Sequence, residues 1–172
     1  SLTAAIVRED GADKIELEEA YIESLEGSLL SNTFFKFGRA FWNVGTLNPQ
    51  HAHADDFADR PLPYRVFLNK AYNDDGLEAS YLFGSSEIGF GIFRGEDFPF
   101  GNTAGSEGTG SDAWSAFYKS TLNLSNTEEL AFNLYHLSGK SKSPNARLGN
   151  EDTVTFSGDS DLSIINLERK SY

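Results

Sequence analysis

The fold class is decided by one segment, Leu77-Glu-Ala-Ser-Tyr-Leu-Phe83, Gly84-Ser-Ser86, Glu87-Ile-Gly-Phe-Gly-Ile-Phe-Arg94. Its two outer parts alternate apolar with polar or small residues, a period of two that is typical of β-strands. The short Gly-Ser-Ser segment between them predicts a tight turn, so the whole segment reads as a hairpin. Glycines at 89 and 91 lie on one face and predict a bend or a close approach of backbone. We expect these residues to share one side of the sheet: Leu77, Tyr81, Ile88, Phe90, Ile92, Leu130, Phe132 and Leu134.

Similar patterns extend the strand prediction to both ends of the chain. Residues 14–25 alternate imperfectly, and because Glu, Leu and Ala favour helices, a helix is the competing interpretation there. Asn73-Asp-Asp-Gly76 is typical of a turn. The predicted strands cover residues 2–7, 14–25, 28–42, 77–83, 87–94, 112–123, 128–138 and 161–168.

The connections between these strands alternate in length. Long loops are expected at 43–76, 95–111 and 139–160, and tight turns are expected between them. Short turns at one end and long loops at the other describe an up-and-down outer-membrane barrel. The sequence therefore predicts an all-β, antiparallel up-and-down β-barrel of about eight strands, or part of a larger barrel, in one domain over residues 1–172.

Composition excludes several classes of function. The chain has 172 residues and a net charge of −12, which argues against nucleic acid as a partner. It contains no cysteine, so disulfides and thiolate metal sites are excluded. No apolar run approaches the roughly 18 residues of a membrane-spanning helix. No nucleophile–base pair or phosphate-binding glycine loop is present, and we expect no enzymatic activity.

The first long loop carries the candidate ligands. Residues 46–68 hold His51 and His53, with Asp55 and Asp56 close behind, and three prolines at 49, 61 and 63. Proline fixes φ and lacks a donor, so we expect neither a helix nor a central strand in this segment.

Histidines two residues apart project to the same side of an extended backbone. Imidazoles with nearby carboxylates suit Zn²⁺, so His51, His53, Asp55 and Asp56 form a candidate zinc site. The competing interpretation is a structural loop held by hydrogen bonds. Oxygen ligands for calcium at 73–75 or at 159 and 161 are a second, weaker hypothesis, because the same residues also make ordinary turns.

Several short motifs also resemble a known family. They are Glu18-Glu-Ala-Tyr21, Phe37-Gly-Arg39, Gly45, Leu47-Asn48, His51, His53 and Asp59-Arg-Pro-Leu62. In these positions the chain resembles bacterial outer-membrane β-barrel proteins described as zinc-regulated TonB-dependent receptors or porin-like proteins. The resemblance covers roughly residues 14–100. It implies an outer-membrane barrel with the His-x-His loop outside the strands, in a chain that is a fragment or a shortened version.

Two functional hypotheses follow. The first is an outer-membrane β-barrel with a pore or uptake role for a small solute, a divalent metal included, whose partners are outer-membrane lipid and that solute. The second is a soluble β-sandwich or barrel that binds through acidic loops. Loop alternation and the resemblance favour the first, whereas charges within 14–25 and 28–42 favour the second, because a lipid-facing Arg or Lys costs roughly 2–4 kcal/mol.

Overall fold

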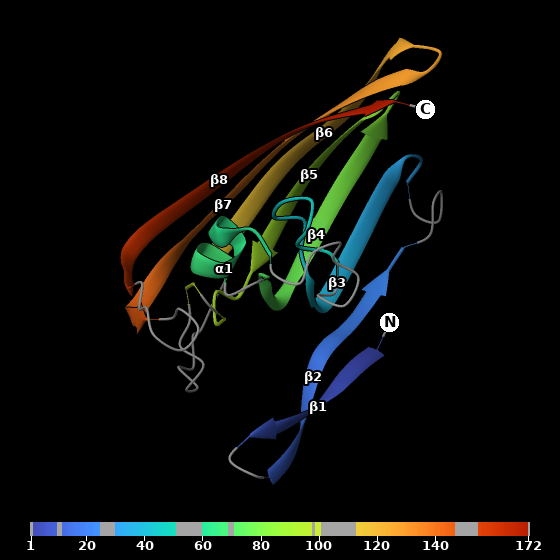
Figure 1. The fold of residues 1–172 in the computed structure, drawn as a ribbon. Helices are drawn as coiled ribbons and strands as arrows, with labels where there is room; N and C mark the ends of the chain where they lie inside the picture. The colour runs from blue at the N-terminus through green and yellow to red at the C-terminus, as the bar shows by residue number, and fades with distance from the viewer. Residues whose placement is uncertain are drawn as a thin grey trace.

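Eight strands form a single antiparallel sheet in the computed structural model (Figure 1). The structure describes residues 2–9, 12–24, 30–50, 60–68, 71–97, 99–100, 113–146 and 155–171. The elements in chain order are β1 (Leu2–Glu9), β2 (Ala12–Glu23), β3 (Thr33–Phe41), α1 (Leu62–Leu68), β4 (Asn73–Phe83), β5 (Ser86–Phe93), β6 (Ala113–Ser125), β7 (Glu128–Ala146) and β8 (Thr155–Ser171).

Every strand pairs with its neighbour in sequence, so the sheet is an up-and-down meander in the order β1 to β8. The all-β, up-and-down prediction is confirmed, and residues 14–23 are strand rather than helix. The sheet is open: among the described residues β1 pairs only with β2, and β8 only with β7. No helix among the described residues is long and apolar enough to cross a membrane.

The strand register sorts the side chains onto two faces. Leu77 pairs with Ile92, and Ile92 pairs with Trp114, so these three side chains share one face. We call it the open face. The predicted set of eight lies on it, which confirms the register inferred from sequence. Its members across the central strands are Leu77, Ala79, Tyr81, Ile88, Phe90, Ile92, Trp114, Ala116, Tyr118, Leu130, Phe132 and Leu134.

Strand ends differ from the sequence prediction in three places. β3 begins at Thr33 rather than 28, after a turn in which Asn32 adopts φ 58°. The predicted turn at 73–76 is wrong, because these residues open β4 and pair with Phe41 to Gly38 of β3. The predicted loop 139–160 is also too long, since β7 runs to Ala146 and β8 begins at Thr155. In the last two cases, pairing with a neighbouring strand outweighs local turn propensity.

The predicted absence of helix in residues 46–68 is wrong for its last part, where α1 forms. The Pro61 carbonyl accepts hydrogen bonds from the amides of Tyr64 (3.0 Å) and Arg65 (3.3 Å), which starts the helix. Pro63 falls in the first turn, where an amide donor has no partner within the helix, so proline is tolerated there. Tyr64 and Leu68 are buried, and Arg65 is exposed.

The hydrophobic core lies on the opposite face, which we call the loop face because α1 and the segment around it cover it (Figure 1). Glycines make room for its rings. A Cβ at Gly89 would strike the Phe117 ring, and one at Gly91 would strike the Phe93 ring. The glycine pattern predicted a close approach of backbone or a bend, whereas the groups that approach these two glycines are aromatic side chains. The buried core residues are Ala40, Trp42, Val44, Tyr64, Leu68, Tyr72, Phe93, Phe100, Ala113 and Leu137.

Candidate functional site

The loop face carries a folded-in layer made of residues 42–50, 60–68 and 71–72, which we call the inner shelf. Its rings pack directly on the strands. Trp42 lies 5.0 Å from Phe93, and Tyr72 lies 5.4 Å from Phe93 and 6.0 Å from Phe100, measured between ring centroids. Tilted and edge-on rings at these separations add to the stabilisation that comes from burial alone. The shelf is therefore packed onto the sheet.

Asn48 holds the two ends of the shelf together. Its amide nitrogen donates to the carbonyl oxygens of Trp42 (2.8 Å) and Tyr72 (2.9 Å), and its Oδ1 accepts from the Tyr72 amide (2.6 Å). The side chain is fully buried. The Tyr72 amide depends on this side chain for its hydrogen bond, while the carbonyls of Trp42 and Tyr72 also accept from the amides of Val44 (2.8 Å) and Trp42 (3.4 Å).

Asp74 ties the shelf to the following loop. Its carboxylate accepts from the Tyr72 hydroxyl (2.8 Å), the Gly95 amide (2.7 Å) and the Asp75 amide (2.8 Å). The Trp42 indole donates to the Asp74 carbonyl at 2.8 Å. Burial, and then the adjacent Asp74 carboxylate, raise the pKa of Tyr72 well above its ordinary value, so the phenol remains a donor.

A second cluster joins the start of the shelf to three strands. The Asn43 side chain donates to Glu78 Oε1 (2.5 Å) and accepts from Lys119 Nζ (2.8 Å), and Lys119 also lies 3.4 Å from Glu87. Lys36 donates to the Phe41 carbonyl at 3.2 Å, and its ammonium lies 4.2 Å from the centroid of the Tyr21 ring. Charged groups in the middle of the strands thus meet their partners on the loop face.

A polar cavity of about 460 Å³ lies beside this cluster. Glu78, Glu87 and Lys36 contribute charged groups to its lining, and Asn43 and Pro49 contribute the shelf side.

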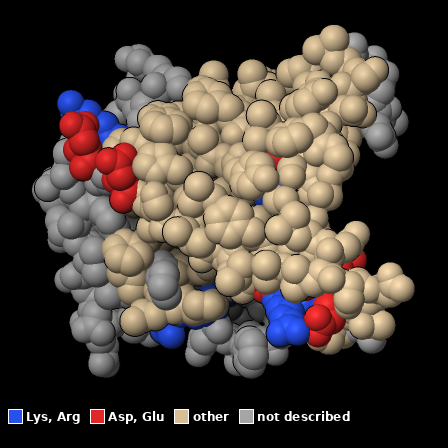
Figure 2. All heavy atoms as spheres, turned by 90° about the horizontal axis from the view of Figure 1, so that it is seen from above, with Lys and Arg blue, Asp and Glu red and all other residues tan. Residues whose placement is uncertain are grey.

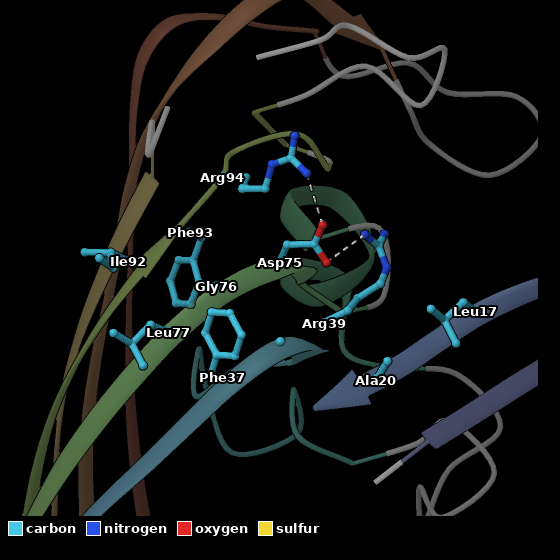
Figure 3. A pocket seen from close by; sticks show the side chains of 11 residues that line it. Leu17, Ala20, Phe37, Arg39, Asp75, Gly76, Leu77, Ile92, Phe93 and Arg94 are labelled. Atoms are coloured by element: carbon cyan, nitrogen blue, oxygen red, sulfur yellow. Dashed lines mark hydrogen bonds and ion pairs between the residues drawn. The ribbon is translucent and has the colours of Figure 1, made fainter. Parts of the chain in front are cut away.

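The open face has a groove of its own, of about 650 Å³, near the ends of β3, β4 and β5 (Figure 3). Most of its lining is apolar, with Phe37, Leu77 and Ile92 along the strands. Its rim is charged: Asp75 lies 3.5 Å from both Arg39 and Arg94.

The rim network extends into the loop after β5. Arg39 donates to Asp97 at 2.6 Å, and Arg94 donates to Glu96 at 2.5 Å. Burial raises the pKa of the Asp97 carboxyl, while the Arg39 guanidinium acts in the opposite direction. The arginines are therefore already paired with carboxylates, and the rim marks a charged border at one end of the open face.

The predicted zinc ligands His51, His53, Asp55 and Asp56 lie outside the described residues, as does Asp59. Arg60, next to them, is buried and donates to the Gln50 carbonyl at 2.5 Å. The described part of the chain contains no group of three or more His, Cys, Asp or Glu residues that would hold a metal ion. The zinc site stays a prediction.

The calcium hypothesis is not supported at 73–75. Asp74 is buried and its oxygens accept protein hydrogen bonds, whereas Asp75 lies on the other face and pairs with arginines. Asp161 of β8 lies beside His136 of β7 on the open face, with 3.9 Å between its Oδ1 and the His136 Nε2. His136 also lies 5.0 Å from the Trp114 ring, in the middle of β7.

Sequence reasoning missed the residues that fix the shelf. Asn43, Asn48 and Lys119 were given no role, and Asp74 was assigned to a turn. Asn48 appeared only within the family resemblance at Leu47-Asn48. A lone asparagine between apolar residues has many interpretations in a sequence. The structural role of Asn48 is visible only in its three hydrogen bonds to residues 6 and 24 positions away.

Comparisons with known proteins give little independent guidance. No family model matches the chain, and no solved structure matches it. An uncharacterised protein from Aquifex aeolicus (strain VF5) is 35% identical over 74 residues, which cover 43% of this chain. The match spans 15% of that protein's length, and its name assigns no activity. The functional argument therefore depends on the geometry of the two faces.

Proposed function

We propose that this chain forms a section of the wall of a bacterial outer-membrane β-barrel with a pore or uptake role for a small solute. The observation that carries the proposal is the distribution of side chains over the two faces. The apolar face is bare, with Phe37 63% and Phe90 52% exposed, whereas the folded-in shelf covers the face that carries the charges. A soluble sheet buries its apolar face and leaves its polar face in water, which is the reverse arrangement.

Charged residues on the open face lie mainly towards the strand ends. Arg39, Asp75 and Arg94 lie at one end, and Glu128 pairs with Arg169 at the other. Between these ends, Asp161 of β8 is the one Asp, Glu, Lys or Arg among the described open-face positions of β3 to β8. Figure 2, which views the molecule from above, shows a broad uncharged surface with charged side chains mainly at its margins. Apart from Asp161 at the β8 edge, this band suits the hydrocarbon region of a bilayer.

Several strands have the length that a bilayer needs, whereas β5, with 8 residues, is shorter. β4 has 11 residues and β6 has 13, and a tilted strand crosses the hydrocarbon region with roughly 9–11 residues. Lys36 is one of the charged residues that favoured a soluble protein. It pairs with Glu78 in register and lies on the loop face. Lys36 therefore carries no cost of lipid exposure.

The inner shelf supports the pore or uptake role. It lies on the face that would line the lumen, and it would narrow the passage to the polar side, where Asn43, Glu78 and Glu87 border the 460 Å³ cavity. A small polar solute fits a space of this size and lining.

Vesicle flotation tests the wall assignment. The purified chain, refolded with phospholipid vesicles, should float with them in a density gradient. Phe90→Lys should reduce the floating fraction, because a lipid-facing Lys costs roughly 2–4 kcal/mol at mid-membrane. Ser80→Lys, on the loop face, is the matched control and should float like the parent. If the parent remains a monomer at the bottom of the gradient, the chain is a soluble binding module instead.

Solute entry tests the pore role separately. Vesicles that contain the parent protein should swell faster in an isosmotic monosaccharide solution than empty vesicles do. Equal swelling rates would remove the pore role and leave the wall assignment untouched.

A divalent metal is the solute or ligand to test first, through the loop at 51–59. Zinc titration calorimetry should show binding by the parent that weakens as the pH falls through about 6.5, where unperturbed imidazole takes up a proton. Replacing both His51 and His53 by alanine should abolish it. Equal heats from the two proteins would make the histidines structural.

A further inference from the structure

Asp161 is an exception within the open face. Between the strand ends, the other described open-face positions of β3 to β8 hold no Asp, Glu, Lys or Arg. An ionisable side chain that faces hydrocarbon costs free energy, and in membrane proteins such residues commonly mark a functional site together with a partner. Asp161 has a partner on the neighbouring strand, because its Oδ1 lies 3.9 Å from Nε2 of His136. The pair is therefore a candidate functional group.

The other ring nitrogen of His136 meets a hydroxyl group. His136 and Ser163 lie directly opposite each other in the β7–β8 ladder, with 2.9 Å between Nδ1 and the Ser163 Oγ. Ser163 and Asp161 are two residues apart in β8, so both side chains project from the open face. A carboxylate beside Nε2 favours the tautomer that carries its proton there. Nδ1 is then free to accept the proton of the Ser163 hydroxyl.

These three side chains have the order of an activated nucleophile. A hydroxyl lies within hydrogen-bond reach of a base, and a third group orients that base. Serine, histidine and aspartate in this order hydrolyse esters and amides on several unrelated folds. The sequence conceals the arrangement, because Ser163 and His136 are 27 positions apart and only the strand register joins them. The expectation of no enzymatic activity depended on the absence of a nucleophile–base pair from the sequence, and the register supplies one.

The group lies a short way inside the charged rim of the open face. Asp161 is in register with Ser138, and Ser138 is in register with Trp114. Trp114 is in turn opposite Ile92, which is two residues from Arg94 of the rim. The ester bonds of a phospholipid lie between its headgroup and its acyl chains, which is the zone just inside such a rim. Trp114 also brings an indole N–H, a hydrogen-bond donor, to this place.

We propose that Ser163 and His136 are catalytic residues that hydrolyse acyl esters of membrane lipids, with Asp161 as a positioning residue. This inference rests on the proposed membrane function, which places the open face against lipid. Ser163 Oγ attacks the ester carbonyl carbon, and its proton passes to Nδ1 of His136. His136 gives this proton to the leaving alkoxide oxygen, so the lysolipid departs and the acyl group remains on Ser163. Water then attacks the acyl carbon and loses a proton to His136, which returns it to Ser163 Oγ as the fatty acid leaves.

Two measurements on the protein in phosphatidylcholine vesicles test the proposal. One is the release of free fatty acid over time, and the other is labelling by a fluorophosphonate probe, located by mass spectrometry. The parent should release fatty acid and carry the probe on Ser163, and Ser163→Ala should lose both. His136→Gln should reduce both by at least about 100-fold, the usual contribution of a general base. Ser80→Ala, on the loop face, is the matched control and should behave like the parent.

Asp161→Asn distinguishes a positioning role from a merely structural one. Because Asp161 acts through His136 and not on the substrate, this variant should lower kcat by about tenfold or more and leave KM nearly unchanged. It should float with vesicles as the parent does. A change in KM with kcat preserved would overturn the positioning role.

The remaining outcomes separate this inference from the proposed function. Fatty acid release that persists in Ser163→Ala would overturn the inference. A floating parent that releases no fatty acid and takes no probe on Ser163 would also overturn it and leave the wall assignment standing. A probe on Ser163 without fatty acid release would overturn lipid as the substrate. A parent that does not float would overturn the proposed function, and the lipid substrate with it.

Discussion

At the scale of single residues, the shelf depends on a few buried polar side chains rather than on its apolar packing alone. Asn48 and Asp74 each satisfy three backbone or hydroxyl groups that water does not reach. Apolar side chains tolerate substitutions of similar volume, whereas removal of a buried hydrogen-bonding partner leaves an unpaired group. These two positions should therefore be the most sensitive in the shelf.

Asn48→Ala should lower the free energy of unfolding by about 1–3 kcal/mol, because it leaves the buried Tyr72 amide without its partner and removes one of the two hydrogen bonds that the carbonyls of Trp42 and Tyr72 each accept. Urea titration in detergent measures the loss. Asn123→Ala, at an exposed position of β6, should change stability by less than about 0.5 kcal/mol. Similar losses in the two variants would mean that the Asn48 hydrogen bonds stabilise the fold no more than an exposed asparagine does.

Tyr72 predicts a dependence on alkaline pH. Its folded pKa is raised, so its contribution to stability is complete below the unfolded pKa near 10 and declines as the pH rises through the folded pKa. At pH 8, Tyr72→Phe should be less stable than the parent by roughly 1 kcal/mol through loss of the bond to Asp74. The difference should shrink by pH 11. Urea titrations at both values test this, and a constant difference would contradict it.

At the scale of elements, the strands combine two surfaces of opposite character through strict alternation. β4 places Leu77 and Tyr81 on the open face and Gly76, Glu78 and Ser80 on the loop face. A one-residue slip would reverse both faces at once, so the register is specified strongly. The same alternation in β5 lets glycines accept the core rings while Ile88 and Phe90 remain outward.

Spin labels on single cysteines should report this alternation in vesicles. Labels at Leu77, Phe90 and Leu134 should collide often with oxygen, which concentrates in hydrocarbon, and rarely with a water-soluble nickel reagent. Labels at Ser80, Glu87 and Asn133 should show the reverse. Low access to both reagents at the first three positions would mean that protein rather than lipid covers the open face.

At the scale of the whole molecule, the open face makes the chain dependent on its surroundings. Solvent-exposed apolar patches of more than a few hundred square ångströms are rare on soluble monomers, and this face runs across β3 to β8. The net charge of −12 opposes association, yet apart from Asp161 the described acidic residues of β3 to β8 lie at the borders of the band or on the loop face.

Dilution from detergent into plain buffer should therefore cause the parent protein to associate, with scattering that rises within minutes. Replacing Ile88, Phe90 and Ile92 together by serine should slow this association several-fold, because it removes adjacent apolar side chains from the band. Light scattering at equal protein concentration compares the two. A parent that remains monomeric in buffer would show that the open face needs no cover.

The sequence by itself determined the strand class, the meander order and the register, because a period of two in residues 77–94 and 128–138 specifies which side chains share a face. It failed where distant contacts outweigh local preference: 73–76 joins a strand because β3 offers it partners, and 62–68 becomes a helix because Tyr64 and Leu68 find a core.

Only the tertiary structure decided which face is covered. The alternation of apolar and polar residues along a strand indicates that the two faces of the sheet differ. It does not indicate whether the apolar residues face a protein core or lipid, because both environments favour the same side chains. The folded-in shelf settles the side on which the core lies, and it is held by Asn43, Asn48 and Asp74 through contacts with residues far away in the chain. Such bonds have no period and leave no pattern along the sequence.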